Sequence, residues 1–280
     1  VCAYFTVIGI RGGFGAYTRP INISNAAQYI KRPIENALVL NTPFSLFTTV
    51  ERQTYHSPAY FSEPELSTIF SPIHRPQPHD DFRPLNVVIV IMESFGKEYI
   101  GFFNRDLDGG TYRGYTPFLD SLLAVSRTFE HSFANGRKSI DAMPSVLSGI
   151  PMFIEPYITT PYATNAVSSI ADVLKAHGYY SAFFHGAPNG SMGFQAYANA
   201  AGYDDYFGMT EYGNDHDFDG VWAIWDEKFL QSFADRMGTF RQPFVTTVFT
   251  ASSHHPFAVP QRYEGKFPKG TLPIHKCIGY

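Results

Sequence analysis

The sequence predicts an α/β fold with a mostly parallel central sheet and helices on both faces, preceded by an irregular, partly helical N-terminal stem. Three observations support this. From Leu85 onward in the 280-residue chain, strand-like and helix-like segments alternate, as they do in parallel sheets with crossover helices. "NVVIVIM", which starts at Asn86, is a continuous apolar run, typical of a central parallel strand covered on both faces. Before Leu85, short helical patterns are broken by Pro and Asn.

We interpret the first part of the chain as a membrane-proximal stem and linker. "VCAYFTVIGI", residues 1–10, is shorter than the about 20 residues that span a bilayer. It is therefore either a buried strand or the end of a membrane helix. Residues 62–86 are rich in Pro, Ser and charge, which predicts an extended linker. A boundary near residues 80–84 divides the chain into a stem, 1–84, and an α/β domain, 85–280.

The elements of the second domain follow from pattern and capping signals. Thr116 and Pro117 are an N-cap and a first helical residue, and Gly149 and Gly178 are expected stop signals. Strands are expected over 86–93, 127–134, 180–186 and 243–249, and helices over 116–126, 139–149, 168–179, 192–202 and 225–237.

Composition excludes some classes of function. Hydrophobic residues make up 44% of the chain and aromatic residues 16%, so a folded domain with a sizeable core is expected. The net charge is −4 and there is no Lys/Arg block, so nucleic acid is not expected as a partner. The two cysteines form no CxxC motif, which leaves thiol-bound zinc and thioredoxin-type chemistry without support.

Polar side chains at strand ends indicate a site. Glu93, His131, His185 and His254 all lie at or just after predicted strand ends, where parallel α/β sheets bind their ligands. A carboxylate at the end of an apolar strand must be solvated, hydrogen-bonded or bound to a cation. Glu93 is therefore either a metal ligand or a carboxylate that caps the next helix or faces water.

The run "ANGRKSIDAMPSVLSGIP" supplies a hydroxyl beside positive charge. Arg137 and Lys138 precede Ser139, which starts a predicted helix where free N–H groups favour anions. A metal ion that lowered the pKa of the Ser139 hydroxyl would make it a nucleophile. The alternative is that Ser139 is only an N-cap.

Histidines complete the candidate site. His185 ends a strand in "FFHG" and is either part of the site or a buried His bonded to a neighbour. His254 and His255 are adjacent, so at most one of them is expected to face the site. An imidazole there would bind an anionic substrate or protonate a leaving group, unless it is only a surface loop residue.

In their order, "VVIVIMESF", "TPFLDSL", "NGRKSIDAMPSVLSGIP", "GYDDYFG", "WDEKFL" and "SSHHPF" resemble the lipoteichoic acid synthase branch of the alkaline phosphatase/sulfatase superfamily. The resemblance covers roughly two thirds of the chain, from about residue 86. It implies that Glu93 is a metal-binding carboxylate, that Ser139 is the nucleophile and a second metal ligand, and that His254 binds substrate. His185 matches a strand-end His of the family.

The resemblance implies a metal-dependent phosphotransferase of the bacterial cell membrane whose catalytic domain faces the periplasm or the outside. It would move a phosphoglycerol-like or phosphoethanolamine-like head group from a phospholipid to an envelope glycan or lipid, through Ser139. Arg137 and Lys138 would add positive charge, and the divalent metal ion would be Mn, with Mg or Zn as alternatives. A membrane segment only partly included here would anchor it. The competing interpretations are a phosphodiesterase or sulfatase-type hydrolase, and a non-catalytic ligand-binding ectodomain.

Three departures from the family pattern narrow this expectation. Met192 and Phe194 stand where the synthases carry a Trp and an Arg that bind glycerol phosphate, which argues against that substrate. The family's Asp-His metal pair is expected beyond Tyr280, so a truncated catalytic domain is expected. The run from Ser139 to Met143 lacks the Pro and Arg needed to form formylglycine, which argues against a formylglycine sulfatase.

Overall fold

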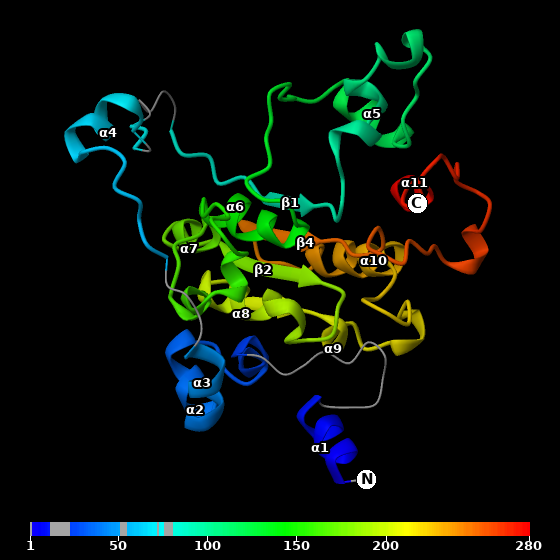
Figure 1. The fold of residues 1–280 in the computed structure, drawn as a ribbon. Coiled ribbons are helices and arrows are strands. Elements are labelled where there is room, and N and C mark those ends of the chain that lie inside the picture. The colour runs from blue at the N-terminus through cyan, green and yellow to red at the C-terminus, as the bar shows by residue number, and fades with distance from the viewer. Residues whose placement is uncertain (1, 12–22, 51–54, 72, 76–80) are drawn as a thin grey trace.

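A single parallel sheet organises the protein. The computed structural model describes residues 2–11, 23–50, 55–71, 73–75 and 81–280. All neighbouring strands in the sheet are parallel, and their order is β1-β4-β2-β3. The predicted parallel α/β fold is therefore confirmed (Figure 1). The strands are β1 (Val87–Ile91), β2 (Tyr180–His185), β3 (Asp205–Phe207) and β4 (Phe244–Phe249).

Three strands end at the same level. Ile91 of β1 pairs with Phe249 of β4, and Phe249 pairs with His185 of β2. The segments that leave these strands therefore emerge side by side, although they are far apart in the sequence. This register determines where the candidate site forms.

Helices pack on both faces of the sheet, as predicted. Side chains alternate along β2, so Phe183 joins one apolar cluster while Phe184 joins another. The first cluster contains residues of α6 (Ala142–Ser148), α7 (Ile170–Lys175) and α8 (Phe194–Ala200). The second contains residues of α9 (Met209–Tyr212) and α10 (Asp226–Met237). Both faces of β2 are thus removed from water. Burial of apolar side chains is the main source of stability for such a sheet.

The predicted capping signals are present, with one difference. Gly149 and Gly178 have φ values of 67° and 80°, and they follow α6 and α7. α5 (Pro117–Leu123) begins at its proline. The Thr116 hydroxyl donates to Asp120 instead of accepting from the backbone. The remaining helix of this domain is α11 (His275–Gly279).

Two strand predictions are wrong. Residues 127–134 form no strand, and Phe129 and Phe133 are exposed there. His131 accordingly does not lie at a strand end. β1 is not a central strand, because within the described residues it pairs only with β4. Val88 and Val90, on one face of β1, remain 44% and 52% exposed. The apolar run predicted burial on both faces, but among the described residues β1 has an unpaired edge and one of its faces is left partly exposed.

The stem is partly helical, as predicted. It contains α1 (Cys2–Arg11), α2 (Asn36–Val39), α3 (Thr42–Thr49) and α4 (Glu63–Ile69). Residues 2–11 form a helix, and residues 2–9 are mostly exposed, so the buried-strand alternative is wrong. Among the described helices, none combines the length and apolarity that crossing a membrane requires.

The expected linker is not wholly extended. α4 lies inside it, because Ser62 and Glu65 form a capping box: the Glu65 carboxylate accepts from the Ser62 N–H and hydroxyl at 2.8 and 2.6 Å. Residues 72 and 76–80 of the linker lie outside the described residues. The boundary at residues 80–84 stays a prediction.

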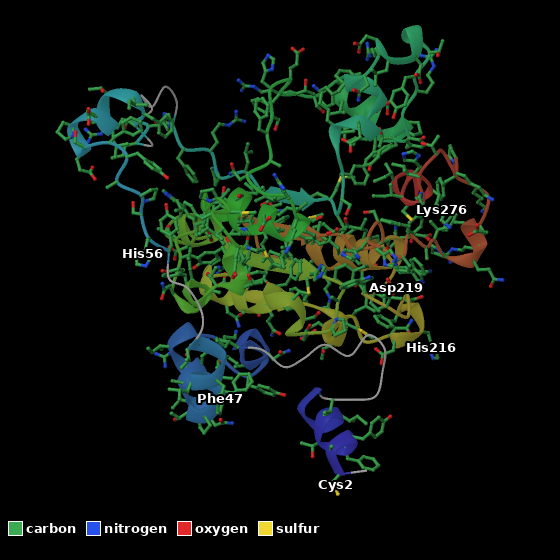
Figure 2. All side chains as sticks on the ribbon, in the orientation of Figure 1. Cys2, Phe47, His56, His216, Asp219 and Lys276 are labelled. Atoms are coloured by element: carbon green, nitrogen blue, oxygen red, sulfur yellow. The ribbon has the colours of Figure 1, made fainter. Side chains whose placement is uncertain are left out.

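The two cysteines are far apart. Figure 2 places Cys2 at the free end of α1 and Lys276, the neighbour of Cys277, in α11 beyond the sheet. Cys2 is exposed and Cys277 is buried, and both are free thiols. Burial raises the pKa of the Cys277 thiol to about 11, so this thiol stays protonated and unreactive near neutral pH.

Candidate active site

One cavity of about 320 Å³ brings together six of the residues predicted for the site, whereas His131 does not line it. It lies beyond the carboxyl ends of β1, β4 and β2, where the sheet register predicts a ligand site. Its lining includes the six predicted residues Glu93, Arg137, Lys138, Ser139, His185 and His254, together with Ser94, Ser191, Met192, Phe194, Trp222 and Thr250.

Glu93 and two hydroxyl groups form the centre of this site. The Ser139 hydroxyl donates to Glu93 Oε1 at 2.8 Å, and the Ser94 hydroxyl donates to the same oxygen at 2.7 Å. The backbone N–H of Ser94 donates to Ser139 Oγ at 3.3 Å. Glu93 is only 7% exposed, and no Lys, Arg or His of the described residues forms an ion pair with it. The carboxylate thus accepts from two side-chain hydroxyls instead of capping a helix, and it lines the cavity.

Local backbone geometry helps to place these groups. Ser94 has a φ of 55°, a left-handed conformation that costs a non-glycine residue about 1–2 kcal/mol and that is concentrated at functional sites. Ser139 begins a 3₁₀ turn, Ser139–Asp141, which continues into α6. The Ser139 hydroxyl bonds Glu93, and it is the Asp141 carboxylate that accepts from the Lys138 N–H at 3.2 Å. The N-cap alternative for Ser139 therefore does not describe its contacts.

Two hydroxyls from the β4 loop hold the backbone of Glu93. Thr250 Oγ1 accepts from the Glu93 N–H at 2.8 Å, and Ser253 Oγ donates to the Glu93 carbonyl. Sequence reasoning did not single out either residue. The only available signal was that Thr250 directly follows a predicted strand.

Asp226 holds the loop that carries these hydroxyls. Its carboxylate accepts from the Ala251 and Ser252 N–H groups, both at 2.8 Å. Its own N–H donates to Ser252 Oγ at 2.9 Å. Burial raises the pKa of Asp226 to about 6, although these hydrogen bonds act to lower that pKa. "WDEKFL" contains Asp226, but sequence reasoning predicted no role for it; an acid in the first turn of a helix was the signal.

His185 enters the cavity as a neutral ring. Its Nδ1 lies 3.0 Å from the Phe249 carbonyl, and because a carbonyl only accepts, Nδ1 carries a proton. Burial lowers the pKa of His185 to about 4. At neutral pH Nε2 is therefore an acceptor, and His185 supplies no positive charge to a phosphate. The ring stacks on Phe194 with centroids 3.8 Å apart.

His254 is held by its neighbours. Its Nδ1 lies 3.0 Å from the His255 carbonyl, so Nε2 is the ring nitrogen that remains for a ligand. The same carbonyl accepts from the Trp222 indole N–H, and the Trp222 and His254 ring centroids lie 4.1 Å apart. His254 lines the cavity whereas His255 is absent from its lining, in agreement with the expectation that at most one of the two faces the site.

Comparison with known proteins identifies the family. The family model described as Sulfatase matches residues 85–276, more than half of the chain. This chain belongs to the sulfatase family. The match begins where the sequence predicted the second domain to begin, and it includes every residue of the candidate site.

Individual relatives agree with this assignment. The sulfatase-family chain is 26% identical over 192 residues to lipoteichoic acid synthase 2 of Bacillus subtilis, covering 67% of this chain and 28% of that protein. It is 25% identical over 217 residues to phosphoglycerol transferase I of Citrobacter koseri, covering 71% and 25%. The chain thus spans about a quarter of the length of these curated relatives.

Solved structures share the fold. A protein of the alkaline phosphatase superfamily from Vibrio parahaemolyticus is 26% identical with a TM-score of 0.59, over 71% of this chain and 48% of that chain. The lipoteichoic acid synthase LtaP from Listeria monocytogenes is 21% identical, with the same TM-score, over 71% and 49%. The fold of this sulfatase-family domain is therefore that of alkaline phosphatase superfamily domains.

The donor chemistry fits part of a divalent cation site. Glu93 is a buried carboxylate without an ionic partner, and Ser139 and Ser94 place hydroxyl oxygens against it. Hard divalent cations prefer such oxygens. Within the described ranges of this sulfatase-family chain, no three His, Cys, Asp or Glu residues come together to hold a metal.

Proposed function

We propose that Ser139 is the nucleophile of a metal-dependent phosphotransferase that moves a head group from a phospholipid to an envelope glycan or lipid. The observation that carries this proposal is the contact of the Ser139 hydroxyl with Glu93 Oε1, at 2.8 Å, in a cavity also lined by Arg137 and Lys138. A buried carboxylate, a hydroxyl and two cations in one cavity suit transfer of an anionic phosphoryl group. Relatives named as synthases and phosphoglycerol transferases add support.

The proposed reaction has two displacements at phosphorus. Ser139 Oγ attacks the phosphodiester and gives its hydroxyl proton to His254 Nε2; the bond from phosphorus to the diacylglycerol oxygen breaks, and diacylglycerol leaves with that proton. The head-group phosphate stays on Ser139 as a phosphodiester. An acceptor hydroxyl then gives its proton to the same nitrogen and attacks the same phosphorus, and Ser139 is released and takes that proton. Arg137 and Lys138 balance the charge of the two non-bridging oxygens, and His185, neutral in this site, accepts a hydrogen bond.

Glu93 and Ser139 are the residues that would hold the divalent metal ion. When bound, such an ion lowers the pKa of the Ser139 hydroxyl and polarises the phosphoryl oxygen. Oxygen ligands favour Mn or Mg, and Zn is the alternative if further ligands are imidazoles.

The residues of the cavity wall indicate which head group the cavity can bind. Met192 and Phe194 line the cavity, and Phe194 is buried against His185. An apolar wall provides no hydrogen bonds for the two hydroxyls of glycerol, so it argues against a phosphoglycerol-like head group. We place the domain on the outer or periplasmic side of a bacterial membrane, anchored by an N-terminal segment. A relative named as a synthase of lipoteichoic acid supports a role in the cell envelope.

The proposed function is tested by the substitution Ser139→Ala. The purified protein, supplied with Mn²⁺, would be incubated with phosphatidylethanolamine or phosphatidylglycerol vesicles, and released diacylglycerol would be measured. Removing the nucleophile should reduce release by about 10³-fold or more. It should also abolish the head-group phosphate adduct that mass spectrometry detects on the peptide containing residue 139.

Ser121→Ala is the matched control, because Ser121 is exposed on α5 and does not line the cavity. Release that persists in Ser139→Ala would refute the nucleophile. Release of the free phosphorylated head group into water, even with a glycan or lipid acceptor present, would identify a phosphodiesterase instead of a transferase.

A further inference from the structure

The cavity wall contains a backbone segment in an unusual conformation. Gly190, Met192 and Gly193 have φ values of 74°, 55° and 79°. Met192 is the only non-glycine residue of the three, and a left-handed conformation costs it about 1–2 kcal/mol. Ser191 and Met192 both line the cavity. A strained segment of this kind persists only where its surroundings hold it in place.

Part of those surroundings is the stem. A 3₁₀ segment of the stem, η1 (Ile23–Gln28), packs against α8 and against the strained turn η9 (Ser191–Gly193). The Asn25 side chain donates from Nδ2 to the Gly190 carbonyl at 3.3 Å. Ala26, next to it, is only 3% exposed. The contact therefore combines a buried Ala26 with a partly buried hydrogen bond from Asn25.

A second set of contacts holds the stem to the other end of the same wall. Asn199, near the end of α8, donates from Nδ2 to the Ile30 carbonyl at 2.8 Å. Lys31 Nζ lies 3.4 Å from the Asp204 carbonyl oxygen, to which it donates. α8 begins with Phe194, a residue of the cavity. Residues 23–31 therefore run along the outside of the wall that η9 and α8 present to the cavity.

We infer that the stem segment 23–31 is a structural part of the substrate cavity: it holds the turn 190–193 in its left-handed conformation and thereby positions Met192. Asn25 is a positioning residue, because it acts on the cavity through the Gly190 carbonyl and does not line the cavity itself. The consequence for head-group choice rests on the proposed function. The effect on the turn itself does not.

Two substitutions detach the stem in different ways. Asn25→Asp keeps the side-chain shape but removes the N–H donor, so the Gly190 carbonyl loses this partner. Ala26→Leu adds volume at a buried contact and pushes η1 away from α8. Asn41→Asp is the matched control. It places the same change in the same stem, at the N-cap of α3, where the side-chain oxygen accepts from the Phe44 N–H and Asp caps equally well.

Hydrogen–deuterium exchange of the full chain measures the result without requiring activity. We expect amide exchange in residues 188–194 to rise about tenfold in both stem variants and to stay unchanged in Asn41→Asp. Exchange in β4 should stay slow in every variant, which shows that the sheet is folded. Faster exchange in residues 23–31 with unchanged exchange in 188–194 would overturn the inference, since the stem would then be only a spacer.

Kinetics address the head group. In the two stem variants, the ratio of kcat/KM for phosphatidylethanolamine vesicles to that for phosphatidylglycerol vesicles should change several-fold. An unchanged ratio, with faster exchange in 188–194, would overturn the role in head-group choice. If the wild-type protein turns over neither lipid, the proposed function fails, while the exchange result still decides whether the stem holds the cavity wall.

Discussion

The cavity has two walls that are held in different ways. The reaction wall consists of Glu93, Ser139 and the loop after β4. It is held from inside the domain, by hydroxyls on the Glu93 backbone and by Asp226 on the β4 loop. The second wall, which we call the selection wall, is formed by η9 and the start of α8. It depends on a left-handed turn and on a stem segment from far away in the sequence.

This difference suggests that the two walls have different roles in the reaction. Short hydrogen bonds between buried groups leave the reaction wall little freedom, as the positioning of a nucleophile requires. The selection wall can change with its stem contacts without disturbing Glu93 or Ser139. Changes in the reaction wall should therefore lower kcat, and changes in the selection wall should act mainly on KM.

The largest effect is expected from Glu93→Gln. The amide keeps the shape but has no charge for a cation, so turnover should fall about 10³-fold or more. Mn²⁺ binding, measured by electron paramagnetic resonance, should weaken strongly. Glu155→Gln, at an exposed carboxylate away from the cavity, is the control and should leave both unchanged. Undiminished Mn²⁺ binding in Glu93→Gln would show that Glu93 is not a ligand of the metal ion.

Asp226→Asn should come next. One of its two backbone N–H partners would face an NH₂ group, so the free energy of unfolding should fall by about 2–3 kcal/mol. Because the β4 loop also holds the Glu93 backbone, kcat should fall about 10²-fold. Urea unfolding and vesicle turnover measure the two effects. Asp235→Asn, at an exposed position of the same helix, should change neither; a loss of stability with normal kcat would separate Asp226 from the reaction wall.

The pH dependence of stability should show two opposite contributions. The pKa of His185 is lowered to about 4, so the unfolded chain binds its proton first and stability falls as pH drops from about 6.5 toward 4. The pKa of Asp226 is raised to about 6, so the folded protein binds that proton first and stability rises as pH drops from about 6 toward 4. Each contribution is about 1–2 kcal/mol between pH 7 and pH 5.

Variants separate these contributions in urea unfolding at pH 7 and pH 5. His185→Gln leaves the Asp226 contribution, so its stability on acidification should rise relative to wild type. Asp226→Asn leaves the His185 contribution, so its stability should fall relative to wild type. Identical pH profiles for the two variants would contradict both assignments.

The smallest effect is expected from Met192→Ala on the selection wall. The shorter side chain enlarges the cavity but leaves the reaction wall intact, so KM should rise about threefold to tenfold while kcat stays within about twofold. Met152→Ala, outside the cavity lining, is the control. A large fall in kcat would show that the two walls are not independent.

Most of the site could be predicted from the sequence because strand ends are local features. The apolar run before Glu93 and the "FFHG" run before His185 show where strands stop, and parallel strands bring their ends together. The edge position of β1 could not be predicted, since an apolar run does not state how many neighbours a strand has. The failed strand at 127–134 has the same cause: strand patterns form strands only where a partner is present.

By itself, the sequence determined the class of fold, the level at which its strands end and the residue types that gather there. Only the tertiary structure decided what holds them. Thr250 bonds Glu93 across 157 positions and Asn25 bonds Gly190 across 165. Such contacts depend on how folded segments pack. The sequence around a hydroxyl or amide in a loop does not predict which distant residue it will bond. The stem has no chemical motif, so its contact with the cavity wall could be recognised only in the folded structure.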